Sequence, residues 1–98
     1  MSVYALAQFS IHDRARYERY VSQFMRVLAG FDARLLAADE APTVVEGTWP
    51  YQKVVLLEFP DRDAFERWAY SPEYTEIARD RIAATTGCVL LVSGIYAS

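Results

Sequence analysis

Cysteine and histidine are nearly absent from this chain, which has only Cys88 and His12 among its 98 residues. A single cysteine excludes an intramolecular disulfide. Its place at the start of an apolar run predicts a buried, inert thiol rather than a nucleophile. No cluster of His, Cys, Asp and Glu has the spacing of metal ligands, so we expect neither a metal site nor another bound cofactor.

Long apolar runs and basic clusters are also missing. The longest apolar run, residues 88–92, is far shorter than the ~20 residues that a membrane span needs. The opening residues lack the basic start and long apolar stretch of a secretory signal, so a cytoplasmic protein is expected. Lysine and arginine are scattered and the net charge is −3, which argues against a nucleic-acid partner. There is no glycine-rich phosphate loop and no nucleophile elbow.

What the chain does have is apolar and aromatic residues, at 53% and 14% of the sequence. This composition is well above that of disordered chains. The length is that of a single domain with a limited core, so residues 1–98 are expected to form one unit.

Alternation and helical spacing predict an α+β chain with the order β-α-β-β-α-β. Asp13 is expected to cap the first helix and Gly30 to end it in a left-handed conformation. Ser71 is expected to start a second piece of the last helix, and Gly87 to break it. The expected strands are residues 3–9, 33–38, 53–59 and 88–96, with residues 43–47 as an irregular extension of the second; the expected helices are residues 13–30, 62–70 and 71–87.

Connections of this length give a four-stranded antiparallel sheet with the helices on one face, the ferredoxin-like arrangement. One face of the first strand carries Val3, Ala5, Ala7 and Phe9. The small side chains of Ala5 and Ala7 are expected to let a helix pack closely on this face. The third and fourth strands are apolar on both faces, although an antiparallel sheet with one wet face should alternate. We therefore expect a second copy of the chain to cover the other face, giving a homodimer.

The third strand and its neighbours also resemble a known family. The pattern Glu46-Gly47-x-Trp49-Pro50, the run Val55-Leu56-Leu57-Glu58-Phe59-Pro60, Trp68, and Ser71-Pro72-Glu73-Tyr74 are similar to the domain-of-unknown-function 1330 family. The resemblance covers nearly the whole chain. It implies the dimeric α/β-barrel architecture, in which two ferredoxin-like sheets face each other. Relatives in that superfamily include cofactor-free oxygenases, isomerases and lyases, as well as proteins with no known activity.

Two residues are candidates for proton transfer. Glu58 lies in an apolar strand, where desolvation could raise its pKa and make it a general acid or base. The alternative is a structural ion pair with Arg34 or Arg81. His12 is either a loop residue or a proton shuttle near the end of the first strand.

Other residues are candidates for binding a ligand. Arg34 and Arg81 could each hold an anion or form a structural ion pair. The aromatic residues at core-facing helical positions either pack the core or line a pocket between helices and sheet. Trp49, in a turn, either plugs the barrel mouth or packs on the other subunit. The candidate ligand residues are Arg34, Tyr17, Tyr20, Trp49, Trp68, Tyr74 and Arg81.

Three functions are compatible with these features. The first is a homodimer that binds a small, partly apolar or acidic molecule between sheet and helices. The second is a cofactor-free enzyme of the oxygenase, isomerase or lyase type that uses Glu58 or His12. The third is a purely structural dimer with a filled interior.

Overall fold

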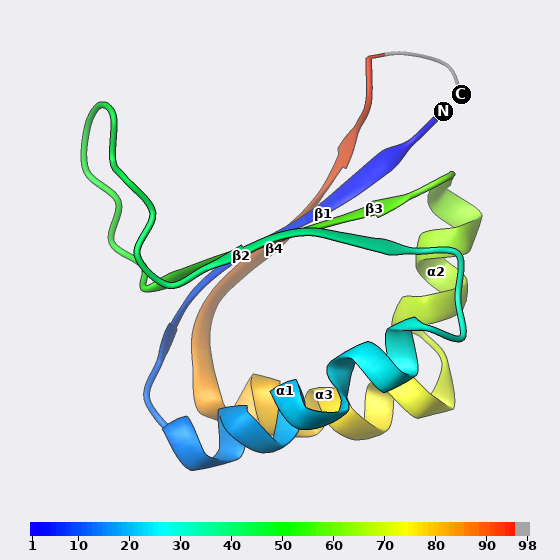
Figure 1. Ribbon diagram of the computed structural model, residues 1–98, viewed down its shortest axis with the longest axis horizontal. Helices are drawn as coiled ribbons and strands as arrows, with labels where there is room; N and C mark the ends of the chain where they lie inside the picture. The colour runs from blue at the N-terminus through cyan, green and yellow to red at the C-terminus, as the bar shows by residue number, and fades with distance from the viewer. Residues whose placement is uncertain (96–98) are drawn as a thin grey trace.

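The computed structural model describes residues 1–95, and the elements follow one another in the predicted order (Figure 1). The strands are β1 (Val3–Ile11), β2 (Arg34–Asp39), β3 (Lys53–Phe59) and β4 (Thr85–Ser93), and the helices are α1 (Arg14–Leu28), α2 (Arg62–Ala69) and α3 (Pro72–Ala84). None of the helices in this part of the chain is long and apolar enough to cross a lipid bilayer.

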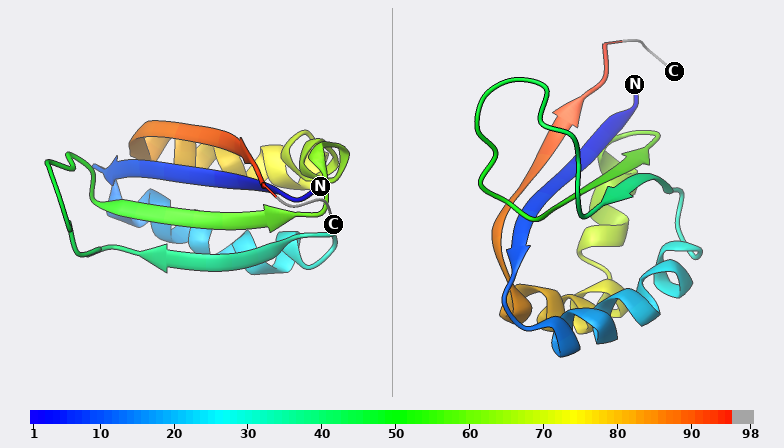
Figure 2. Two further views of the ribbon diagram at one scale, coloured as in Figure 1. Left: turned by 90° about the horizontal axis from the view of Figure 1, so that it is seen from above. Right: turned by 60° about the vertical axis from the view of Figure 1, so that its left-hand side comes forward.

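The four strands form one antiparallel sheet in the order β2-β3-β1-β4. All three helices lie on one side of it, and α1 and α3 run side by side below the strands (Figures 1 and 2). Central strand β1 pairs with β3 on one side and β4 on the other, so the two β-α-β halves interleave. This is the predicted ferredoxin-like α+β fold.

Each helix begins at a side chain that accepts a backbone hydrogen bond. Asp13 accepts from the amide of Arg16, at 3.1 Å, before α1. Asp61 accepts at 2.8 Å from the amide of Ala64, before α2. Ser71 caps α3 and is followed by Pro72 at the first helical position. The cap signals in the sequence therefore set all three helix starts, because they satisfy amides that otherwise lack partners.

The two glycine signals for helix ends are wrong. Helix α1 ends at Leu28, and Ala29 after it is still in the right-handed region. The amide of Gly30 donates to the carbonyl of Val27 at 3.2 Å, and this bond closes the last turn without a left-handed residue. Helix α3 ends at Ala84, because Thr85 turns extended. Gly87 lies inside β4 opposite Phe9, where a Cβ would stand 2.1 Å from the carbonyl oxygen of Gln8. It is needed for close approach of strands.

Strand boundaries also differ from the prediction. Strand β4 starts at Thr85 rather than residue 88, and the expected end at Tyr96 lies outside the described residues. Residues 43–47 form no strand. They belong to the β2–β3 loop (residues 40–52), which projects from one end of the sheet (Figure 1). Cys88 is exposed, not buried, because it lies on edge strand β4.

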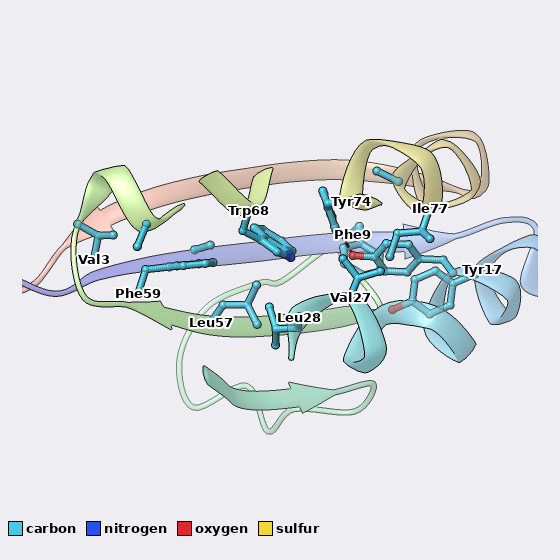
Figure 3. Close-up of a cluster of buried hydrophobic side chains, with 14 of the residues drawn as sticks. Val3, Phe9, Tyr17, Val27, Leu28, Leu57, Phe59, Trp68, Tyr74 and Ile77 are labelled. Atoms are coloured by element: carbon cyan, nitrogen blue, oxygen red, sulfur yellow. Dashed lines mark hydrogen bonds between the residues drawn. The ribbon is translucent and has the colours of Figure 1, made fainter. Parts of the chain in front are cut away.

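The core lies between the sheet and the helices (Figure 3). Strand residues Val3, Phe9, Leu57 and Phe59 point toward the helices and define the inner face of the sheet, to which the buried Ala5 also belongs by alternation along β1. The other side, which we call the outer face, carries the alternate residues of the same strands. Its apolar members include Leu6, Leu56, Leu90 and Val92, which the register places in neighbouring rows. No helix of residues 1–95 covers this face, and Leu90 is 47% exposed.

Candidate ligand-binding cavity

A cavity of about 490 Å³ lies between the inner face and the helices. Ala5, Ala7 and Phe9 of β1 form its floor together with Val55 and Leu57 of β3. The helices contribute mainly aromatic side chains, namely Tyr17, Tyr20, Phe24, Phe65, Trp68 and Tyr74. Its volume is in the range of pockets that hold small molecules.

The cavity exists because large side chains separate the two layers while small ones lie between them. The tilted rings of Phe9 and Tyr17 pack with centroids 5.6 Å apart between β1 and α1. Those of Phe59 and Trp68 pack with centroids 5.4 Å apart between β3 and α2. Ala5 and Ala7 extend only one carbon from the central strand and cannot fill the space left there. The prediction that these alanines bring a helix close to the sheet is wrong, because they leave room for the cavity.

Two tyrosine hydroxyls form the polar centre of the cavity wall. The Tyr20 and Tyr74 oxygens are 2.8 Å apart and joined by a buried hydrogen bond. Burial, and then the neighbouring Tyr74, raise the pKa of Tyr20 well above its ordinary value, so the hydroxyl stays protonated. Burial lowers the pKa of the nearby Arg81, but Tyr74 and Tyr20 raise it by more in sum, and the guanidinium remains charged.

Trp68 contributes a polar atom with no partner. Its side chain is buried, and its Nε1 finds no hydrogen-bond acceptor in the described part of the chain. The ring of Tyr74 lies 4.0 Å away, centroid to centroid. An indole N–H can only donate, so a donor within the cavity wall is left unsatisfied in residues 1–95, and the nitrogen atom itself is closed off from the cavity by its neighbours.

Lys53 and Arg81 are the charged side chains of residues 1–95 that line the cavity, and both are cationic. The Lys53 Nζ lies 4.8 Å from the centroid of the Tyr17 ring, a cation–π contact. Within residues 1–95 neither cation forms an ion pair with a carboxylate. The cavity is therefore positively charged inside a chain whose net charge is −3.

The cavity opens at both edges of the sheet, with different chemistry at each. At the β2 edge the exposed lining residues Val21, Met25 and Leu35 make an apolar opening. At the β4 edge a smaller hollow of about 170 Å³ adjoins the cavity and shares Arg81 with it. Thr85 and Cys88 lie in this second hollow.

The structure brings together five of the seven predicted ligand residues. The five that line the cavity are Tyr17, Tyr20, Trp68, Tyr74 and Arg81. Lys53 and Phe24 also line the cavity and were not among the predicted residues. The position of Lys53 at the start of an inner-face strand pattern could have indicated it, as could that of Phe24, one helical turn after Tyr20.

Glu58 and Arg34 lie outside the cavity, paired on the outer face. The Arg34 Nε donates to Oε1 of Glu58 at 2.9 Å, its Nη2 contacts the same oxygen, and the Tyr4 hydroxyl donates to Oε2 at 3.3 Å. The Arg34 hydrogen bond lowers the pKa of Glu58, which is opposite to the rise expected from burial. The Glu58 side chain is 19% exposed and stays ionised at neutral pH.

Trp49 and His12 also lie away from the cavity. Trp49 lies at the base of the β2–β3 loop and donates from Nε1 to the Oε1 atom of Gln8, at 2.9 Å. This bond fixes the ring over the outer-face end of β1. His12 is exposed in the β1–α1 connection, and its backbone amide donates to the Ala84 carbonyl at 2.9 Å. No three His, Cys, Asp or Glu side chains of the described residues gather as metal ligands would.

A four-stranded antiparallel sheet with helices on one face and a cavity between the layers defines a ferredoxin-like α+β protein. Its family follows from the sequence match. The family model described as "Domain of unknown function (DUF1330)" matches residues 2–95, so the chain belongs to that family, as its motifs indicated. No curated protein matches the sequence.

Solved structures share the fold at low sequence identity. The protein RPA0582 of unknown function from Rhodopseudomonas palustris has a TM-score of 0.80 and 15% identity over 97% of this chain and 83% of its own. SnoaB, a cofactor-independent oxygenase from Streptomyces nogalater, has a TM-score of 0.68 and 16% identity over 97% of this chain and 94% of its own. A dimeric ferredoxin-like protein of unknown function from Thermobifida fusca has a TM-score of 0.68 and 12% identity over 96% and 92%.

Proposed function

We propose that this protein is a homodimer that binds a small, partly apolar or acidic molecule in the cavity between sheet and helices. The observation that carries the proposal is a cavity of about 490 Å³ whose aromatic walls include a buried donor without a partner. A purely structural interior would fill such a space with side chains and satisfy its polar atoms. An apolar pocket with a few polar groups is the usual form of a small-molecule site.

The binding proposal is tested by a thermal-shift screen of small carboxylates and quinone-like aromatic compounds, followed by titration calorimetry on the hits. A ligand that binds only the folded chain raises its melting temperature by an amount that grows with the logarithm of one plus the ratio of free ligand concentration to Kd. We expect at least one hit whose affinity falls when Ala7→Leu fills the floor of the cavity. If every compound leaves melting unchanged, the binding proposal fails.

The homodimer is proposed to form through the outer face. Leu6, Leu56, Leu90 and Val92 make an apolar surface there that the described chain leaves uncovered, and the Thermobifida fusca protein of this fold is described as dimeric. Two copies that meet by a two-fold axis would each bury this face.

Light scattering on a size-exclusion column tests the dimer. We expect wild-type protein to run as a dimer and Leu90→Glu as a monomer, because the substitution places a carboxylate in the apolar interface. Val21→Glu is the matched control, since Val21 is 39% exposed on α1 on the opposite side of the sheet. A Leu90→Glu protein that remains dimeric would contradict this interface.

The second candidate is a cofactor-free enzyme that uses Glu58 or His12. Its support is the fold shared with SnoaB, described as a cofactor-independent oxygenase. Against it, Glu58 is held by Arg34 on the outer face and His12 is exposed outside the cavity. Glu58→Gln separates the roles. A structural pair loses thermal stability with ligand affinity unchanged, whereas a group that acts on the ligand changes affinity or turnover with melting unchanged.

A further inference from the structure

The positive charges that line the cavity indicate the charge that a ligand would carry. Buried or half-buried charges in proteins are normally paired, because desolvation of an unpaired charge is costly. Arg81 lines the cavity beside two neutral hydroxyls, and no carboxylate of residues 1–95 reaches it. Lys53 adds a second positive charge to the same lining. An anionic group in the cavity would supply the partner that the chain does not.

The Trp68 indole adds a second requirement. Its Nε1–H is buried and unsatisfied, and an unpaired buried donor costs about 1–3 kcal/mol. The ring stacks against Tyr74, which links it to the Tyr20–Tyr74–Arg81 group. Figure 3 shows the nitrogen edge of Trp68 on the side of the ring toward Tyr74. The nitrogen is closed off in this structure, so an acceptor oxygen on a ligand near Tyr74 would satisfy this donor only after the Trp68 or Tyr74 ring shifts.

The two openings fix the direction of such a ligand. The exposed lining residues at the β2 edge are apolar, namely Val21, Met25 and Leu35. Lys53 of the neighbouring strand β3 is held over the Tyr17 ring. Arg81 lies where the cavity meets the hollow at the β4 edge. Aromatic rings line the space between the two edges. An apolar body therefore fits between the layers toward β2, with its charged end toward β4.

We propose that the ligand is an amphipathic organic acid, with an aromatic or other apolar body among the rings and a carboxylate or similar anionic oxygen group on Arg81. A shift of the Tyr74 or Trp68 ring on binding lets a second oxygen of that group, or a carbonyl next to it, accept from Trp68 Nε1. This assignment rests on the proposed binding function and names the class of molecule that the cavity takes. Guanidinium groups match carboxylates by paired, charge-assisted hydrogen bonds.

The first test compares acids with their uncharged amides. The compounds are 2-naphthoate, indole-3-acetate and decanoate, each paired with its primary amide and titrated by calorimetry at pH 7. We expect at least one acid to bind at least about tenfold more tightly than its amide, as charge-assisted bonds predict. In Arg81→Gln the preference should shrink to about twofold or less. Arg79→Gln is the control on the same helix, because Arg79 is exposed and pairs with Glu76.

The second test needs no substitution in the cavity. The chain has two tryptophans, and Trp49 Nε1 already donates to Gln8. In proton–nitrogen correlation spectra, a bound acid should move the Trp68 indole signal downfield and leave that of Trp49 nearly in place. Trp49→Phe, outside the cavity, assigns the two signals by removing one. This readout holds even if Arg81→Gln does not fold.

The outcomes separate the two proposals. If acids and amides bind equally well, the cavity binds apolar molecules and the assignment of an acid is overturned, while the binding function stands. The same follows if Arg81→Gln keeps the preference, or if binding leaves the Trp68 indole signal unmoved. If no compound of the six binds, both the assignment and the binding function are overturned.

Discussion

The substitution Ala7→Leu asks whether the space between the layers is empty. Ala7 lies in the central strand with Val55 and Val89 as its neighbours in the register, and all three line the cavity. A leucine at this position would project three further carbon atoms from the floor of the cavity. No other change in the chain is introduced, so the sign of its effect on the free energy of unfolding reports on the space itself.

The magnitude follows from the apolar surface that leaves water. Three carbons at about 0.8 kcal/mol for each buried methylene give an upper bound of roughly 2.4 kcal/mol. The cavity is open at both edges, so part of the new side chain stays in contact with water and a gain of about 1–2 kcal/mol is expected. For a domain of this size, a change of 1 kcal/mol corresponds to about 4–8 °C in Tm.

Ala64→Leu is the matched control. Ala64 lies on α2, is 2% exposed and does not line the cavity. The same three carbons have no space there, and overpacking typically costs about 1–3 kcal/mol. The two substitutions are therefore expected to have opposite signs although their chemistry is identical.

The assay is urea unfolding followed by circular dichroism, with all variants at one protein concentration because a dimer's stability depends on it. If Ala7→Leu destabilises the chain as much as Ala64→Leu does, the space is already filled. That result would refute the cavity and remove the site on which the binding proposal stands.

Three further predictions concern single residues. Gly87→Ala should lower the free energy of unfolding by about 3 kcal/mol or more, because the added Cβ would stand 2.1 Å from a backbone oxygen. In the same urea assay Gly30→Ala is the control and should be neutral or stabilising, since the nearest atom to its added Cβ is 3.6 Å away. Ser71→Ala should cost about 1–2 kcal/mol in that assay through loss of the α3 cap. Because the folded pKa of Glu58 lies below 4.5, its pair stabilises the fold above that pH and the benefit is lost as pH falls through the folded pKa. Glu58→Gln should thus lower Tm at pH 7 and match wild type in strong acid; equal melting at pH 7 would contradict the pair.

Local signals in the sequence were enough to predict most of the framework. Asp13 and Ser71 start helices because each satisfies free amides within its own next few residues, an interaction that no distant part of the chain has to support. Strand β3 was predicted to the residue, since Pro60 cannot continue a ladder and its apolar run begins after a turn. The faces of the strands followed from their period of two.

Features that depend on two distant segments could not be predicted in this way. Gly87 looked like a helix break, and only the register with Gln8 and Phe9 shows that the neighbouring strand requires it. Ala5 and Ala7 are small in any reading, but whether a small residue admits a helix or leaves a cavity depends on rings elsewhere, such as Phe9 and Trp68, that set the distance between the layers. The orphan donor of Trp68 is likewise a property of packing and has no sequence signal.

The proposed ligand cavity and the proposed dimer interface lie on opposite faces of the same sheet. Alternation along β1 sends Leu6 to the outer face and Ala5 and Ala7 to the cavity, so the same strand serves dimer formation and ligand binding through different residues. No side chain contributes to both, and any coupling between them has to pass through the backbone of the sheet. Since a ligand shifts an equilibrium only through differential contacts with its two states, a rigid sheet makes the two events independent. We therefore expect the monomeric Leu90→Glu protein to bind a ligand with the affinity of the dimer. A large loss of ligand affinity in the monomer would instead show that the partner subunit affects the shape of the cavity through the sheet, which separates the cavity from the dimer interface.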